Sequence, residues 1–191
     1  MKKLNSIIVL LAVGFLFACN SNKPQTLSEE NKTALMLLGD SISTEMQNVL
    51  LLNVATAIQQ GGTDYAVEFC NVNALSITDS VALKHKTFIQ RLSDKNRNPA
   101  NAVNSQMDSL AWKKIKTDKT DFVTQDEQGD VYYYKPIMLG MPACIKCHGG
   151  KEDISESTQK LIAEKYPNDK ALDYKLGDLR GMWKIKLKEN E

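Results

Sequence analysis

Cys144, Cys147 and His148 lie within one short stretch and together could hold an iron-containing cofactor. Two residues three positions apart share one side of a helical turn, so both thiols could add to the two vinyl groups of a single haem. The imidazole that follows directly could then reach the iron as an axial ligand. Residues 144–148 therefore predict one covalently bound haem c, with thioether bonds to Cys144 and Cys147 and with His148 on the iron.

The same two thiols could instead form a redox-active dithiol or half of a zinc site. A structural zinc site needs about four ligands, and the chain offers few other candidates. A dithiol of the thioredoxin kind should follow an early strand of a βαβ unit, whereas residues 144–148 come late in the chain. Haem attachment is therefore the preferred interpretation.

The start of the chain has the pattern of an export signal. A short basic start precedes an unbroken apolar or small run at 7–17, which is too short to span a bilayer. The run ends at 16–19 (LFAC), which resembles a bacterial lipobox with cleavage before Cys19 and lipid on its sulfur. The alternative is an ordinary secretory signal followed by an incidental cysteine.

The predicted domain organisation is a signal peptide at 1–18, a lipidated tether at 19–31 and one haem-binding domain at 32–188. Haem c is attached outside the cytoplasm, so the signal and the haem motif agree. Asn20 does not match the aspartate that retains lipoproteins in the inner membrane, which favours the periplasmic face of the outer membrane. The formal net charge of +1 gives no reason to expect a nucleic-acid partner.

Hydrophobic periodicity predicts an α+β fold with long N-terminal helices and a small antiparallel sheet. Gly61-Gly62 should end the first helix, and Thr63 can cap the second. The alternation of Trp183, Ile185 and Leu187 with lysines predicts a half-buried strand. The expected helices are 33–60, 63–82, 107–115 and 155–166, and the expected strands are 86–92, 121–125, 131–135 and 181–187.

The chain has four cysteines. Lipid would take Cys19 and haem would take Cys144 and Cys147, so Cys70 remains without an assigned role. It falls on the expected helix 63–82, and Ala66 and Ala74 lie one turn to either side. These small neighbours could leave a shallow groove for a flat macrocycle. A buried free cysteine is equally compatible with this position. If Cys70 is not the second axial ligand, the rivals are His85, Met138, Met141 or a vacant site.

A basic stretch at 84–97 contains two arginines that could pair with the carboxylates of haem. A solvated face is the ordinary interpretation of such a stretch. Haem carries two propionates, and the planar fork of an arginine matches a carboxylate. Arg91 and Arg97 are therefore candidate propionate partners.

Several short stretches stand out along the chain, in the order 66–70 (AVEFC), 97–101 (RNPAN), 134–137 (YKPI), 144–149 (CIKCHG), 166–170 (YPNDK) and 177–181 (GDLRG). Together they resemble a family of single-haem c-type proteins with a PAS-like fold, long described as a domain of unknown function. Members occur alone as exported proteins and as extracytoplasmic parts of bacterial signalling receptors. The resemblance implies that Cys70 is the second axial ligand, opposite His148.

Two classes of function follow. A thiolate ligand favours ferric iron and a low potential, so reduction could free the position for carbon monoxide or nitric oxide and make the protein a sensor. Such a sensor would act through a separate protein partner, because no output domain is evident. The alternative is a membrane-tethered electron carrier. We expect no enzymatic activity, because two histidines do not support a Ser/His/Asp-type set.

Overall fold

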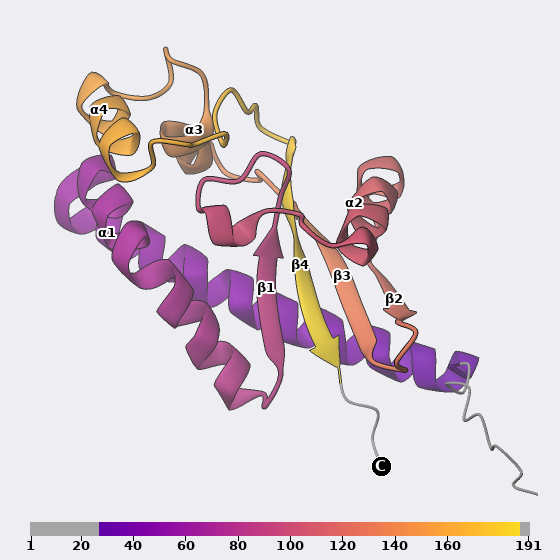
Figure 1. Ribbon diagram of the computed structural model, residues 1–191. Helices are drawn as coiled ribbons and strands as arrows, with labels where there is room; N and C mark the ends of the chain where they lie inside the picture. Colours follow the sequence, from indigo (N-terminus) through magenta and orange to yellow (C-terminus); the bar gives the residue numbers. More distant parts are fainter. Residues whose placement is uncertain (1–26, 188–191) are drawn as a thin grey trace, which may run out of the picture.

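A computed structural model describes residues 27–187 of the chain. In chain order, the elements are α1 (Glu29–Lys84), β1 (Phe88–Leu92), the short 3-10 helix η1 (Pro99–Asn101), α2 (Gln106–Asp118), β2 (Phe122–Gln125), β3 (Val131–Met138), α3 (Pro142–His148), α4 (Glu156–Lys165) and β4 (Leu179–Leu187). The strands form one four-stranded antiparallel sheet in the order β1-β4-β3-β2 (Figure 1). The predicted α+β class with a small antiparallel sheet and a long N-terminal helical region is confirmed.

The long helix α1 consists of two segments joined at the predicted break. Gly61 and Gly62 have non-helical dihedral angles, and the φ of 72° at Gly62 is one that glycine adopts without a steric penalty. Figure 1 shows the chain turning sharply there, at the end of the molecule that carries α4. The first segment crosses behind the sheet, and the second returns towards β1. The hydroxyl of Thr63 lies 2.7 Å from that of Thr158, which links this turn to α4.

The N-terminal predictions lie mostly outside the described residues. This holds for the signal peptide at 1–18, for Cys19 and for most of the tether at 19–31. Ser28 caps α1 by accepting a hydrogen bond from the backbone of Asn31, so the last residues of the predicted tether are helical. None of the helices in residues 27–187 is long and apolar enough to cross a membrane.

Helices cover both faces of the sheet. Tyr133 and Tyr134 are neighbours on β3 and point to opposite faces, yet both are fully buried. Tyr133 packs in a cluster with α1 residues such as Met46, and Tyr134 packs in a second cluster with α2 residues such as Ile115. The prediction of a half-buried strand at 181–187 holds at its C-terminal part, where the Lys186 side chain is 41% exposed. It is corrected at Met182, on the same face, which is fully buried against α2.

Proline is accommodated within β3, which continues past its predicted end at residue 135. Pro136 pairs with Met182 of β4. On the other side, the pairing of β3 with β2 ends at Tyr134. The missing N–H of proline therefore removes no hydrogen bond of the β2–β3 ladder.

Gly39 lies where α1 approaches the sheet most closely. A methyl group at this position would collide with the ring of Tyr133, which is fully buried. We expect Gly39→Ala to lower the free energy of unfolding by about 1–3 kcal/mol, because overpacking forces buried groups out of place. Urea unfolding followed by circular dichroism would measure this change.

Gly140→Ala is the matched control for Gly39→Ala. A Cβ at Gly140 would meet no atom within 4 Å, so we expect a change below about 0.5 kcal/mol. Equal losses in the two variants would contradict the close-approach explanation.

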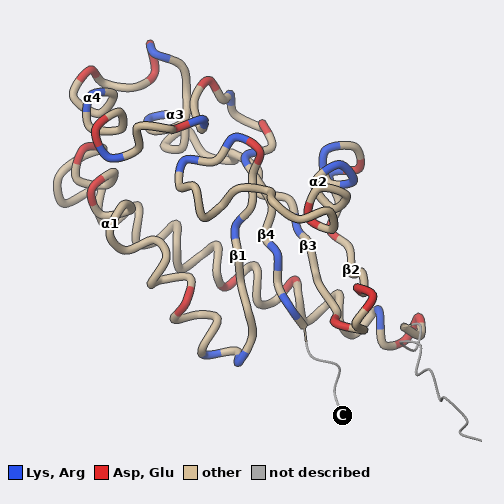
Figure 2. The backbone as a smooth tube through the Cα atoms, in the orientation of Figure 1, with Lys and Arg blue, Asp and Glu red and all other residues tan. Residues whose placement is uncertain are grey.

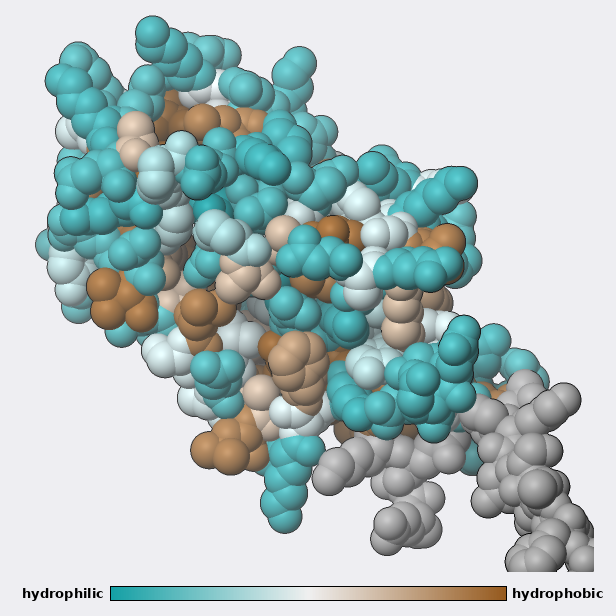
Figure 3. All heavy atoms as spheres, viewed as in Figure 1, coloured by the Kyte–Doolittle hydropathy of each residue, from teal (hydrophilic) through white to brown (hydrophobic). Residues whose placement is uncertain are grey.

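The surface carries charges of both signs without a single-sign stripe. Figure 2 shows acidic and basic residues interspersed along most elements. Figure 3 shows a largely hydrophilic face with separate hydrophobic patches. The distribution of surface charge therefore does not single out a docking face.

Candidate functional site

The short helix α3 carries the three motif residues. Pro142 stands in its first turn, where a missing N–H costs little and the fixed φ suits a helix. The helix ends at His148, and Gly149 is its C-cap. Cys144 and Cys147 therefore lie one helical turn apart, as predicted, and both are half-buried.

The orientation of His148 is set by a backbone carbonyl. Its Nδ1 lies 2.9 Å from the oxygen of Ala171. A carbonyl can only accept, so Nδ1 carries the proton and Nε2 presents its lone pair. Burial, followed by the positive charges of Arg97 and Arg180, holds the pKa of His148 well below its usual range. The imidazole is therefore neutral near pH 7, which is its metal-binding form.

The two thiols of α3 face different surroundings. Cys147 packs against Val67 of α1 and Ile162 of α4. Burial raises the pKa of the Cys147 thiol to about 11. Cys144 packs instead against a small cluster that contains Leu139. The α3 turn is therefore held between α1, α4 and the end of β3.

Cys70 lies on the second segment of α1, facing the motif. It is half-buried, with buried Ala66 one turn before it and Ala74 one turn after it. Burial raises the pKa of the Cys70 thiol, and the positive charge of Arg91 acts against this rise. Val67, which lies one turn before Cys70 on α1, packs in one cluster with Cys147 of α3. The fold thus brings together cysteines that are far apart in sequence.

No disulfide competes for these thiols, because the three described cysteines are all free. Within residues 27–187, no three or more His, Cys, Asp or Glu side chains are grouped so that they could hold a metal ion. A zinc site of about four protein ligands is therefore not assembled in this part of the chain.

Arg97 already has partners close to the motif. Its guanidinium forms an ion pair with Asp169 at 2.9 Å, and the two side chains are 12% and 5% exposed. The same guanidinium donates to the carbonyl of Cys147 at 2.6 Å. Arg97 thus connects α3 to the segment before β4. That Arg97 pairs with a haem propionate stays a prediction.

Arg91 and Arg180 are arginines whose guanidinium groups keep free hydrogen-bonding capacity. The Arg91 guanidinium forms no hydrogen bond or ion pair with another described residue, and in Arg180 a terminal nitrogen donates to the carbonyl of Lys95 at 3.1 Å while Nε is buried without a partner. Burial lowers the pKa of both, that of Arg180 to about 10. An unsatisfied buried donor costs free energy, so an acceptor is expected here. Arg180 was missed as a candidate, although it lies within the matching stretch 177–181.

The rival axial ligands differ in position. Nε2 of His85 lies 2.9 Å from a carboxylate oxygen of Glu45. His85 caps the C-terminal end of α1, which is at the opposite end of the molecule from α3 (Figure 1). Met138 ends β3 and Met141 precedes α3, and they are 36% and 43% exposed. The fold therefore keeps both methionines near the motif and places His85 away from it.

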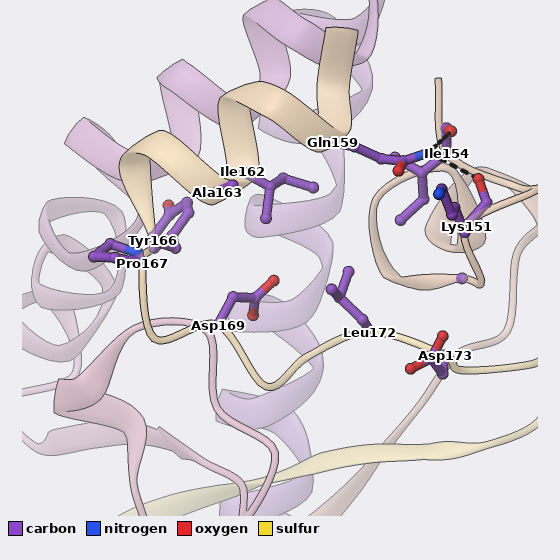
Figure 4. Close-up of a pocket in the computed structure, with 11 residues that line it drawn as sticks. Lys151, Ile154, Gln159, Ile162, Ala163, Tyr166, Pro167, Asp169, Leu172 and Asp173 are labelled. Atoms are coloured by element: carbon purple, nitrogen blue, oxygen red, sulfur yellow. Dashed lines mark hydrogen bonds between the residues drawn. The ribbon is translucent and has the colours of Figure 1, made fainter. Parts of the chain in front are cut away.

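One hollow adjoins the motif. It measures about 380 Å³ and is lined by the residues after His148, by α4 and by the segment that follows α4. Figure 4 shows Ile162 and Leu172 directed into it, with Asp169 at the side. A smaller hollow of about 160 Å³ lies between α1 and β1 and includes Ala74 and Arg91. Cys70 and the α3 residues line neither hollow, so these hollows do not constitute the site.

Comparisons with known proteins agree with this architecture. The model of the family described as Tll0287-like matches residues 21–187. The crystal structure of the cyanobacterial heme-protein Tll0287 resembles the chain with a TM-score of 0.60 and 21% identity, covering 86% of this chain and 99% of that one. At this identity the likeness shows a shared fold. No curated protein matches.

Proposed function

This chain belongs to the Tll0287-like family, and we propose that it is an exported mono-haem c-type protein that senses redox state or a small ligand such as carbon monoxide or nitric oxide. It would act through a separate protein partner. The observation that carries this proposal is the packing of α1 against the motif helix α3, where Cys147 contacts a cluster that contains Val67, one turn before Cys70. Nδ1 of His148, which is also on α3, lies 2.9 Å from the carbonyl oxygen of Ala171. The solved relative is described as a heme-protein, which supports haem as the ligand.

Each motif residue has one role in this proposal. Cys144 and Cys147 would hold the haem through thioether bonds, His148 would bind the iron through Nε2, and Cys70 would bind it from the other side. Bound haem would supply an iron that changes oxidation state and binds small ligands. The PAS-like fold and the His/Cys ligation are part of the proposal.

The basic residues fit the carboxylates of such a group. Haem brings two propionates, and a buried arginine donor without a partner is satisfied by a carboxylate. Nε of Arg180 is such a donor, and Arg91 has no ion pair among the described residues. We therefore add Arg180 to Arg91 and Arg97 as candidate propionate partners. Arg97 is the weakest of the three, because Asp169 already holds it.

The position of Cys70 favours a sensor over a carrier. Cys70 lies in the α1 segment that follows Gly61 and Gly62, where the helix already changes direction. A change in ligation at Cys70 would act on this segment, which leads directly to β1. A local ligand change of this kind can bias a two-state element. An electron carrier would need no such connection and is the alternative.

Export and anchoring rest on the sequence pattern. We propose lipidation of Cys19 and attachment to the periplasmic face of the outer membrane. The anchor would raise the effective concentration of the haem near membrane partners. Incorporation of labelled fatty acid, and its loss in Cys19→Ser, would test this independently of haem.

The ferric electron paramagnetic resonance spectrum of haem-loaded protein tests the ligation. We expect a low-spin thiolate signal in the wild type that disappears in Cys70→Ala, because alanine has no sulfur to bind iron. Met141→Leu is the control and should keep the signal, because leucine replaces the side chain at similar volume.

Two other results would change the proposal. Identical spectra for the wild type and Cys70→Ala would exclude Cys70 as the ligand and move attention to Met138 or Met141. Failure of the reduced wild type to bind carbon monoxide, combined with fast electron exchange, would favour the electron carrier.

A further inference from the structure

We propose that Arg97 and Asp169 are positioning residues for the axial histidine. They hold the backbone of Ala171, whose carbonyl accepts the hydrogen bond from His148, and so they set the orientation and basicity of the imidazole. This inference rests on the proposed function, because the basicity matters only when His148 binds iron.

A continuous set of contacts connects the ion pair to the imidazole. Arg97 donates to Oδ2 of Asp169 from Nε at 3.1 Å and from a terminal nitrogen at 2.9 Å. The other carboxylate oxygen, Oδ1, accepts the N–H of Ala171 at 2.8 Å. The carbonyl of Ala171 then accepts from Nδ1 of His148 at 2.9 Å. The Asp169 carboxylate therefore joins the arginine to the backbone of Ala171, and a terminal nitrogen of Arg97 also donates to the Ala171 carbonyl at 3.4 Å.

Further bonds hold the same segment against α3. Arg97 also donates to the carbonyl of Cys147, and the N–H of Tyr174 donates to the carbonyl of His148 at 2.9 Å. Ala171 is fully buried, and Asp169 is nearly so. Charge-assisted hydrogen bonds in such surroundings are stronger than neutral ones and restrict geometry. The Ala171 carbonyl therefore has little freedom to turn away from Nδ1.

A well-aligned acceptor on Nδ1 increases electron donation from Nε2. Stronger donation to iron stabilises the ferric state and lowers the reduction potential. Arg97 and Asp169 carry opposite charges, so their ion pair adds no net charge near the iron. The ion pair should therefore change the reduction potential by fixing the position of the Ala171 carbonyl.

The test uses the haem-loaded full chain and three variants. Asp169→Asn weakens the contact with Arg97. Arg97→Lys keeps the charge and loses the planar fork. Asp173→Asn is the matched control, because it removes the same charge from the same segment and the Asp173 carboxylate forms no hydrogen bond or ion pair among the described residues. The φ of 61° at Asp173 is one that asparagine tolerates.

We expect Asp169→Asn and Arg97→Lys both to raise the midpoint potential. The expected rise corresponds to about a tenfold change in the ratio of reduced to oxidised protein, or about 59 mV for one electron. Asp173→Asn should shift it far less. An unchanged potential in Arg97→Lys, or equal shifts in Asp169→Asn and Asp173→Asn, would overturn the proposal.

A haem-independent measurement separates this inference from the proposed function. Nitrogen-15 spectra of the haem-free protein report the tautomer of each histidine, and His85 serves as the internal reference. We expect His148 to be protonated on Nδ1 in the wild type, with more Nε2–H in Arg97→Lys and Asp169→Asn. An unchanged tautomer would overturn the positioning role. If the wild-type protein carried no covalent haem, the proposed function would be wrong. The tautomer measurement could still be interpreted, because it uses haem-free protein.

Discussion

Replacing both Cys144 and Cys147 with serine is expected to abolish covalent haem attachment completely. The attachment needs a sulfur that adds to each vinyl group, and a serine hydroxyl does not form that bond under the same conditions. The measurement is the haem that remains with the protein after denaturation and acid–acetone extraction, in cells that carry the machinery for haem attachment.

The single variants and Cys70→Ser complete this experiment. Cys144→Ser and Cys147→Ser should each retain at most one thioether bond. Cys70→Ser should keep its covalent haem, because Cys70 is proposed to bind the iron and not the vinyl groups. Extraction-resistant haem in the double variant would contradict the proposed attachment, whatever the axial ligands are.

Replacing Asp108 with alanine is expected to lower the free energy of unfolding by about 3–5 kcal/mol, more than the other substitutions proposed above. Asp108 of α2 lies 2.8 Å from the Lys184 ammonium group on β4, and these side chains are only 8% and 13% exposed. The carboxylate also accepts a hydrogen bond from the buried hydroxyl of Tyr134 at 2.7 Å. The variant would leave the charge of Lys184, whose side chain is only 13% exposed, without its partner. Urea unfolding at pH 7 measures the loss.

Asp118→Ala is the control for Asp108→Ala. Asp118 pairs with Lys114 one turn earlier in the same helix, and those side chains are 38% and 49% exposed. An exposed pair of this spacing contributes less than about 0.5 kcal/mol. Similar losses in the two variants would show that the position of Asp108 between α2 and the sheet has no special importance.

The same carboxylate predicts a dependence of stability on pH. Burial alone would raise the pKa of Asp108, but hydrogen bonds from Lys184, Ser105 and Tyr134 outweigh it and lower the pKa. Its stabilising contribution is therefore fully present above the unfolded-state pKa of about 3.9 and is lost as the pH falls through the lower folded-state value. Asp108→Asn should reduce this acid sensitivity, and urea midpoints between pH 7 and pH 3 would test it.

Local patterns in the sequence were sufficient for most elements. The break at Gly61 and Gly62, the helical turn at 144–148 and the alternation along β4 all depend on neighbours within a turn or on the backbone preferences of single residues. The burial of Met182 on the second face of β4 was missed because the alternating lysines suggested an exposed face. Lys184 on that face is in fact only 13% exposed beside Asp108, whose carboxylate compensates its charge.

The sequence by itself determined the α+β class, the helical breaks and the residue types that could attach haem, because these depend on composition and on short spacings. Only the tertiary structure decided which distant groups meet. It placed the α1 segment that carries Cys70 against α3, paired Arg97 with Asp169, left Nε of Arg180 without a partner and held His85 against Glu45 at the other end. Such contacts depend on how the helices pack on the sheet and on the order of its strands, and no short sequence pattern records either.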